Sequence, residues 1–208
     1  MTDAVSSTPL VVVISGPSGV GKTTLCDNIR AALPSVSRVL TCTTRKPRDG
    51  ELDGVDYYFL GEDEFLGRVE NGEFLEHAVV HENHYGVLKS ELRAKLAEGS
   101  DVLLNIDVQG AVTIRDAAAG DPILNEALLT VFLCPASLGE LEQRLRGRST
   151  DSDEIIANRL AIARDEMDQA EKFNHKLTSQ TREADLGQML GIIERARPSK
   201  REAVSTDE

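Results

Sequence analysis

Short runs of apolar residues, separated by longer amphipathic segments, dominate this 208-residue chain. The three runs are residues 10–15 (LVVVIS), 102–106 (VLLNI) and 129–134 (LTVFLC). Continuous apolar runs of this length are typical of strands buried on both faces of a parallel sheet. Helical patterns cover residues 22–33, 89–98 and 109–119. Because strands and helices alternate, the sequence predicts an α/β fold, with a mainly parallel sheet core flanked by helices.

Two regions depart from this alternation. Residues 36–87 carry short, alternating signals with turns at 47–50 and 52–54, which predicts a small α+β insertion of mixed strands. Residues 138–167 are helical and rich in arginine, and their middle, 147–153, is polar. A helical segment interrupted in this way predicts a hinged flap.

Composition indicates one globular domain, residues 10–197, between polar segments at 1–9 and 198–208 that are predicted to be flexible tails. The 35 acidic residues outnumber the 23 basic ones, and the net charge of -12 disfavours binding to nucleic acid or to an anionic membrane. Any phosphate group must therefore be held by a local arrangement of donors. We also predict a cytoplasmic location, because the chain has neither an apolar run near the roughly 18 residues of a membrane span nor a secretory signal pattern.

A glycine-rich motif, GPSGVGKT at residues 16–23, follows the first apolar run and precedes a helical pattern. In this context the motif predicts a phosphate loop, whose backbone N–H groups and helix N-terminus surround phosphate oxygens. Lys22 adds a positive charge, and the hydroxyl of Thr23 can bind Mg²⁺. The predicted ATP-binding residues are Gly16, Pro17, Ser18, Gly19, Val20, Gly21, Lys22, Thr23 and Thr24.

Asp107 stands at the carboxyl end of the second apolar run, in the segment NIDVQG. Ligands of open α/β sheets bind at this end of the strands. Alone, Asp107 could equally be the N-cap of the next helix. Beside a phosphate loop, we favour a site residue that orients Mg²⁺, directly or through water, or the acceptor nucleotide.

Basic residues are concentrated in TCTTRKPR, residues 41–48, whereas the next 16 residues contain seven acidic residues and no basic one. Two arginines close together can bind phosphate oxygens through planar, two-pronged contacts, and nearby tyrosines can add hydroxyl donors. Taken alone, the segment could also be a solvated basic turn.

The order of these segments resembles the guanylate kinase family. After the phosphate loop come TTRKPRDGELDGVDYYF (43–59), GEFLEHAVVHENHYG (72–86) and NIDVQG (105–110), and the resemblance runs from about residue 10 to residue 177. It implies a P-loop nucleoside monophosphate kinase that uses Mg²⁺ and transfers the γ-phosphoryl group of ATP to GMP, giving ADP and GDP. The substrates ATP and GMP would be its small-molecule partners, and the chain would be a monomer or a homodimer.

The resemblance also assigns an acceptor site. The residues implied in GMP binding are Thr41, Arg45, Arg48, Tyr57, Glu76, Tyr85 and Asp107. Arg45, Arg48 and the two tyrosines would hold the phosphate, and Glu76 would read the base. The chemistry is consistent, because a carboxylate accepts hydrogen bonds from guanine N1–H and the 2-amino group together, a donor pair that adenine lacks.

Phosphoryl transfer depends on positioning and on positive charge around the transferring group. The residues implied in catalysis are Lys22, Arg45, Arg144, Arg148 and Arg159. The last three lie in the arginine-rich flap, where Arg146 and Arg164 are interpreted as surface charges. Any one of these helical arginines could instead be solvated or paired with an acid four residues away.

Four features depart from the family pattern. Val87 stands where the family usually has Ser or Thr, and Asn105 where an acid is common. Ser179 replaces an asparagine near the adenine, at the end of a segment that differs from the family's strand. The connection at residues 119–127 is longer than the corresponding connection in the family, and the extra residues are predicted to extend a surface loop.

The resemblance divides the domain into three parts. These are a core (10–35, 93–137 and 169–197), an NMP-binding region (36–92) and a lid (138–168). Two alternatives remain open: a P-loop kinase of another nucleotide or sugar phosphate, and a guanylate-kinase-like module that binds proteins without catalysis. The intact phosphate loop disfavours the second.

Overall fold

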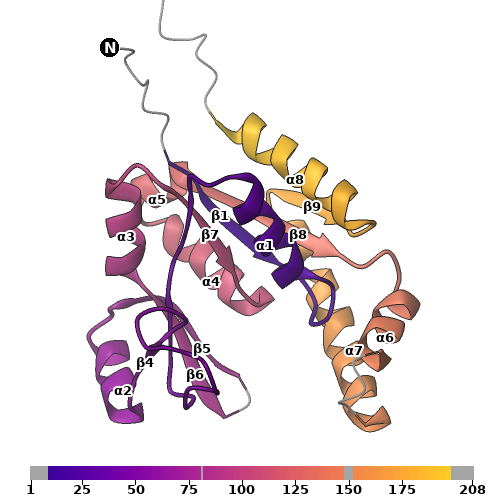
Figure 1. Cartoon of the computed structure of the whole chain (residues 1–208), viewed down its shortest axis with the longest axis horizontal. Coiled ribbons are helices and arrows are strands. Elements are labelled where there is room, and N and C mark those ends of the chain that lie inside the picture. Colours follow the sequence, from indigo (N-terminus) through magenta and orange to yellow (C-terminus); the bar gives the residue numbers. More distant parts are fainter. Residues whose placement is uncertain (1–8, 81, 148–151, 198–208) are drawn as a thin grey trace, which may run out of the picture.

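The computed structural model describes residues 9–80, 82–147 and 152–197. Its strands form a five-stranded and a four-stranded sheet, which lie in different parts of the molecule (Figure 1). Except for Pro9, the segments predicted as tails fall outside the described residues.

The five-stranded sheet is parallel throughout, with strand order β2-β7-β1-β8-β9. Its strands are β1 (Val11–Ser15), β2 (Val36–Arg38), β7 (Asp101–Asn105), β8 (Leu128–Cys134) and β9 (His175–Thr178). The three central strands correspond to the three apolar runs of the sequence, so the predicted parallel α/β core is confirmed. Every residue of β1 is buried, which accounts for its unbroken apolar pattern.

Helices cover both faces of this sheet. They are α1 (Lys22–Ala32), α3 (Lys89–Ala97), α4 (Val108–Ala118) and α8 (Arg182–Ala196). Successive side chains of a strand point to opposite faces. Val12 and Ile14 of β1 therefore join the buried cluster of α1 and α8, and Val11 and Val13 join that of α3 and α4.

The prediction of a surface loop at residues 119–127 is wrong, because helix α5 (Pro122–Ala127) occupies most of this segment. The side chain of Asp121 accepts hydrogen bonds from the backbone N–H groups of Ile123 (3.1 Å) and Leu124 (3.2 Å), and Pro122 stands in the first turn. An aspartate N-cap followed by proline favours a helix start. Leu124 and Ala127 are buried, so the insertion adds to the core.

The four-stranded sheet has mixed strands in the order β4-β3-β6-β5, as predicted for the insertion. Its strands are β3 (Thr41–Thr43), β4 (Tyr58–Phe59), β5 (Phe74–Val80) and β6 (Asn83–Leu88), and helix α2 (Glu62–Glu70) lies between β4 and β5 along the chain. Its own small core contains Cys42, Phe65, Phe74 and Leu88, and the rings of Phe65 and Phe74 stack with centroids 4.4 Å apart. Strand β2 lies within residues 36–92 along the chain but pairs with β7 in the larger sheet.

Two helices, α6 (Leu138–Arg146) and α7 (Asp153–Asp168), form the arginine-rich part of the chain, and the 3₁₀ turn η1 (Ala170–Lys172) follows them. Ser137 and Ser152 cap the two helices by accepting backbone N–H groups. The predicted polar break falls between the two helices, with residues 148–151 outside the described part. Leu141, Leu145 and Ile156 bury the apolar side of the pair against the core.

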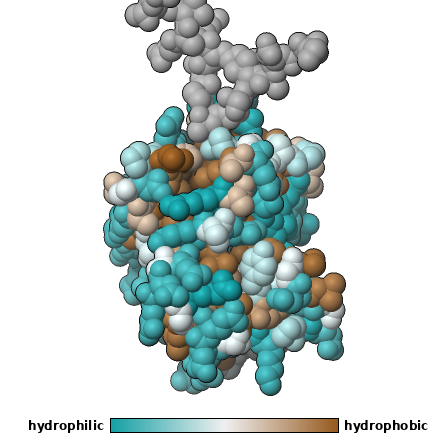
Figure 2. All heavy atoms as spheres, turned by 90° about the vertical axis from the view of Figure 1, so that its left-hand side faces the viewer, coloured by the Kyte–Doolittle hydropathy of each residue, from teal (hydrophilic) through white to brown (hydrophobic). Residues whose placement is uncertain are grey.

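Figure 2 shows the face that carries α2 and α3, where hydrophilic side chains cover most of the surface and hydrophobic ones form separate patches. This distribution agrees with the high charge content of the chain. Among the described residues, we find no helix with the length and apolar character needed to span a membrane.

Candidate active site

The phosphate loop connects β1 to α1 at the carboxyl edge of the core sheet. Gly16 has φ = 141°, and a Cβ atom at this position would lie 2.3 Å from the carbonyl oxygen of Leu133 in β8. Gly21, directly before α1, has φ = 114°. Glycine adopts such angles without strain, and it alone tolerates this close approach. The backbone of the loop therefore requires glycines of the motif.

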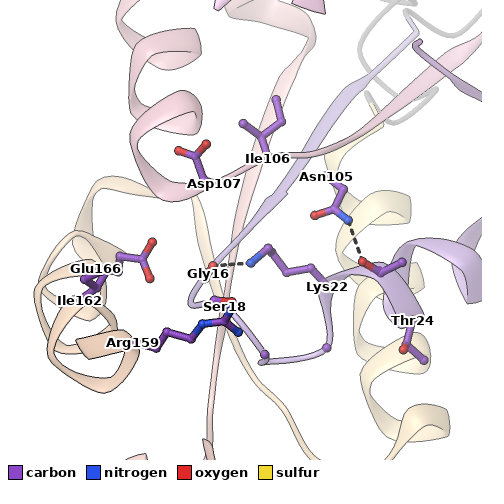
Figure 3. A pocket seen from close by; sticks show the side chains of 13 residues that line it. Gly16, Ser18, Lys22, Thr24, Asn105, Ile106, Asp107, Arg159, Ile162 and Glu166 are labelled. Atoms are coloured by element: carbon purple, nitrogen blue, oxygen red, sulfur yellow. Dashed lines mark hydrogen bonds between the residues drawn. The ribbon is translucent and has the colours of Figure 1, made fainter. Parts of the chain in front are cut away.

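Lys22 and Thr23 stand at the start of α1. The Lys22 Nζ group donates to the carbonyl oxygens of Gly16 (2.6 Å) and Pro17 (3.0 Å), so the ammonium group lies over the loop (Figure 3). The Thr23 hydroxyl oxygen accepts a hydrogen bond from Asn105 Nδ2 at 3.2 Å. This contact joins the loop to the carboxyl end of β7.

A cavity of about 450 Å³ adjoins the loop. Its lining side chains come from the loop, from the carboxyl end of β7 and from α7 (Figure 3). They include the predicted residues Gly16, Ser18, Gly19, Gly21, Lys22, Thr23, Thr24, Asp107 and Arg159. The structure thus gathers seven of the nine predicted ATP-binding residues and one predicted lid arginine around a single cavity, whereas Pro17 and Val20 do not line it.

Glu166 also lines this cavity, and sequence reasoning missed it. Figure 3 shows Arg159 and Glu166 extending from α7 toward the cavity. The two residues are seven positions apart, or about two helical turns, so they share a face. Burial raises the pKa of Glu166, the positive charge of Lys22 lowers it, and the negative charge of Asp107 raises it. The spacing from Arg159 is the signal that could have identified Glu166.

A second cavity, of about 310 Å³, adjoins the first, and both are lined by Thr23, Asn105 and Ile106. Thr41 and Tyr57, both predicted for the acceptor, line it as well. So does Arg38 of β2, which sequence reasoning did not select. The predicted donor and acceptor regions therefore meet at the carboxyl end of β7.

Glu51 contacts both arginines of the basic turn. Its carboxylate accepts from Arg45 Nη2 (2.9 Å) and from the backbone N–H of Arg48 (2.7 Å). The hydrogen bond to Arg45 is the main cause of the lowered pKa of Glu51. The guanidinium of Arg45 also lies 5.5 Å from the ring centroid of Tyr57, whose ring is 6.3 Å from that of Tyr85. Arg45, Tyr57 and Tyr85, three of the four residues predicted for the acceptor phosphate, thus lie in one cluster, and Glu51 is an addition that the sequence did not reveal.

Glu76 lies in a row with two other side chains of the small sheet. Val87 on β6 pairs with Thr41 on β3 and with Glu76 on β5, and paired residues of antiparallel strands share a face. The Glu76 residue is only 6% exposed, and in the described part of the chain no donor forms a hydrogen bond with its carboxylate. Burial, and secondarily the negative charge of Asp107, raise the pKa of Glu76 to about 7.

Asp107 is the N-cap of α4, and its Oδ1 atom accepts from the backbone N–H of Gly110 at 2.8 Å. It also lines the phosphate cavity. Asp107 therefore caps the helix and also faces the cavity, and its predicted role toward Mg²⁺ or the acceptor nucleotide stays a prediction.

Comparison with known proteins agrees with this arrangement. The family model "Guanylate kinase" matches residues 8–196. A guanylate kinase of Fusobacterium nucleatum is 42% identical over 182 residues, which cover 88% of this chain and 94% of that protein. One of Cereibacter sphaeroides is 42% identical over 179 residues, covering 86% of this chain and 82% of that protein. The chain belongs to the guanylate kinase family. The solved structure of guanylate kinase from Anaplasma phagocytophilum superposes with a TM-score of 0.71 at 29% identity, covering 94% of this chain and 89% of the other.

Within this guanylate kinase fold, the predicted lid arginines have different surroundings. Arg159 lines the phosphate cavity, whereas Arg144 lines a separate cavity on the other side of the loop. There Arg144 Nη1 donates to the carbonyl oxygen of Val20 at 2.6 Å and lies 3.4 Å from Ser179 Oγ. Arg148 lies outside the described residues. The catalytic roles predicted for Arg144 and Arg148 stay predictions.

The departures from the family pattern are integrated into the fold. Val87 is buried between Thr41 and Glu76 in the strand register. The Ser179 hydroxyl donates to Asp185 Oδ2 at 3.0 Å, which ties the end of β9 to α8. Although its residues differ from the family's strand, the segment still forms β9 beside β8.

Proposed function

We propose that the chain is a guanylate kinase, which transfers the γ-phosphoryl group of ATP to GMP and releases ADP and GDP. The single observation that carries the choice of GMP is Glu76. Glu76 is a residue with only 6% exposure, and its carboxylate has no donor among the described residues, which is unfavourable for the ionised group in the free protein. Guanine offers it N1–H and a 2-amino group side by side, whereas adenine presents no such pair.

The Glu51-bound turn provides the site for the acceptor phosphate. Arg45 is oriented by Glu51 and by the ring of Tyr57, so its guanidinium needs little ordering when a phosphate arrives. Arg48, Tyr57 and Tyr85 add donors around it, and Thr41 approaches the base from the strand next to β6. These assignments are proposals that rest on the clustering of the residues.

The phosphate loop would hold the ATP phosphates. Its backbone N–H groups and the N-terminus of α1 provide donors, while Lys22 and Arg159 provide positive charge to the group in transfer. Of the residues proposed for the acceptor, Thr41 and Tyr57 line the second cavity, which shares Thr23, Asn105 and Ile106 with the first, so the two substrates would bind side by side. Proximity and electrostatic stabilisation are then the main sources of catalysis, and no covalent intermediate on the protein is needed.

The polar residues of the phosphate cavity have the chemistry needed to bind Mg²⁺. The Thr23 hydroxyl, the Asp107 carboxylate and the amide oxygen of Asn105 are oxygen groups of the type that Mg²⁺ prefers, and all three residues line the phosphate cavity. No group of three or more His, Cys, Asp or Glu side chains suited to a metal occurs in the described segments, which fits an ion held largely by phosphate oxygens and water. When bound, the ion would neutralise charge on the ATP phosphates.

An ADP-release assay tests the proposal. The purified chain is supplied with ATP, Mg²⁺ and one acceptor at a time: GMP, AMP, UMP or ribose 5-phosphate. We expect turnover with GMP that disappears in Lys22→Ala. Faster turnover with another acceptor would favour a divergent P-loop kinase, and absence of turnover with every acceptor would favour a protein-binding module. The predicted cytoplasmic location and the choice between monomer and homodimer stay predictions.

A further inference from the structure

Gly110 lies in the first turn of α4, directly beside the Glu76 carboxylate. Its φ angle is not among the positive values of the described chain, so the backbone conformation does not require glycine. Glycine inside a helix costs about 1 kcal/mol relative to alanine. The reason for glycine at this position must therefore lie in the space around it.

A side chain at position 110 would occupy space that other groups fill. A Cβ atom there would lie 2.9 Å from Glu76 Oε2, 3.4 Å from Glu76 Cδ and 2.5 Å from Ile106 Cγ2. The first and third distances are shorter than van der Waals contact. By contrast, a Cβ at Gly67 in α2 or at Gly187 in α8 would have no atom within 4 Å. Of these three helical glycines, Gly110 is therefore the one at which a side chain would meet its neighbours.

A methyl group at position 110 would displace the Glu76 carboxylate, which ends a side chain inside a closely packed region. The residue is almost fully buried and its strand is paired with β6 through Val87. Strand β5 also packs closely against α4. A displacement of the carboxylate by a few tenths of an ångström would move its two oxygens relative to a bound base, and recognition through paired hydrogen bonds is sensitive to shifts of this size.

We infer that Gly110 is a specificity-determining position: by lacking a side chain it leaves the space in which the Glu76 carboxylate faces the acceptor base. Gly110 is a positioning residue, since it acts through Glu76 and not by touching the base. This inference rests on the proposed guanylate kinase activity and adds to it a residue outside the set proposed to contact GMP.

The test compares Gly110→Ala with the wild-type chain in the ADP-release assay, using GMP and IMP as acceptors. IMP keeps N1–H but lacks the 2-amino group, so its use reports on the second hydrogen bond to Glu76. We expect Gly110→Ala to raise the KM for GMP at least 10-fold and to reduce the preference for GMP over IMP, with the KM for ATP changed less than twofold. Gly187→Ala is the matched control and should leave all three values unchanged.

A second pair of variants separates the effect on Glu76 from general damage. In a Glu76→Gln background, Gly110→Ala should have almost no further effect on the KM for GMP, because both changes act on one interaction. If Gly110→Ala does not fold, Ile106→Ala combined with Gly110→Ala removes the contact with Ile106 Cγ2 and keeps the one with Glu76.

Three results would overturn the inference: an unchanged KM and preference in Gly110→Ala, an equal rise in the KM for ATP, or full additivity with Glu76→Gln. These outcomes are distinct from failure of the proposed function. In that case the wild-type chain itself would not phosphorylate GMP.

Discussion

Glu76 lies in a poor environment for an ionised carboxyl group. Its pKa rises from an ordinary value of 4.5 to about 7, so wild-type stability falls as the pH rises through this range. We predict that Glu76→Gln raises the free energy of unfolding of the ligand-free protein by about 2 to 3 kcal/mol at pH 8. At pH 5 most of this gain should vanish, because the wild-type carboxyl group is then protonated in the folded state.

Urea unfolding at pH 5 and pH 8 measures this difference, with the exposed Glu70→Gln as a control. An equal effect of Glu76→Gln at both pH values would contradict the account of Glu76. The same variant should bind GMP more weakly, since an amide cannot accept both guanine donors.

Glu51 is expected to preorganise the acceptor phosphate site. Glu51→Gln weakens the charge-assisted hydrogen bond to Arg45 and should raise the KM for GMP about 3- to 10-fold, with little change in the KM for ATP. Steady-state kinetics with each substrate varied in turn provide the measurement. A lower KM for GMP in the variant would show instead that Glu51 competes with the phosphate for Arg45.

Individual residues show which parts of the candidate site could be predicted from the sequence and which could not. Lys22, Thr23 and Asp107 were predicted because motif spacing fixes their place relative to the loop and the strand ends. Glu51 and Glu166 were missed, because an acid in an acidic stretch or on a charged helix looks like any solvated residue. The contact of Glu51 with Arg45 is visible only in the folded chain, whereas the spacing of Glu166 from Arg159 was a signal for a residue that faces the phosphate cavity.

Strands that are buried on both faces could be predicted from the sequence. Elements whose conformation depends on contact with a single neighbouring element could not. The apolar runs of β1, β7 and β8 report directly on burial from both sides. In the edge strand β9 only Leu177 is buried, so its pattern carries little signal, and its conformation depends on pairing with β8. Helix α5 was missed because its apolar stretch is only two turns long, although Asp121 and Pro122 mark its start.

Helix α7 is expected to contribute to the phosphate cavity through one face only. We predict that Arg159→Ala lowers kcat at least 100-fold, because it removes a positive charge from the site of phosphoryl transfer. The exposed Arg164 on the same helix is the matched control, and Arg164→Ala should change kcat less than twofold. Similar losses in both variants would indicate damage to the helix and not loss of a site residue.

For the whole molecule, the small sheet and the α6 and α7 pair extend from different sides of the core (Figure 1). Arg45 and Arg159 belong to these two parts, and their positive charges should draw together only when both phosphates are bound. We therefore predict that the radius of gyration, measured by small-angle X-ray scattering, decreases when GMP and a nonhydrolysable ATP analogue are present together. No decrease with both ligands would contradict closure.

The central claim is that Glu76 selects the acceptor base, and the ratio of kcat/KM for GMP to kcat/KM for IMP tests it most directly. A hydrogen bond to a charged group contributes roughly 1.5 to 3 kcal/mol, so the wild-type chain should prefer GMP by about 10- to 150-fold. Glu76→Gln should bring this ratio close to unity. A wild-type ratio near one, or a strong preference that survives in Glu76→Gln, would show that another group reads the base.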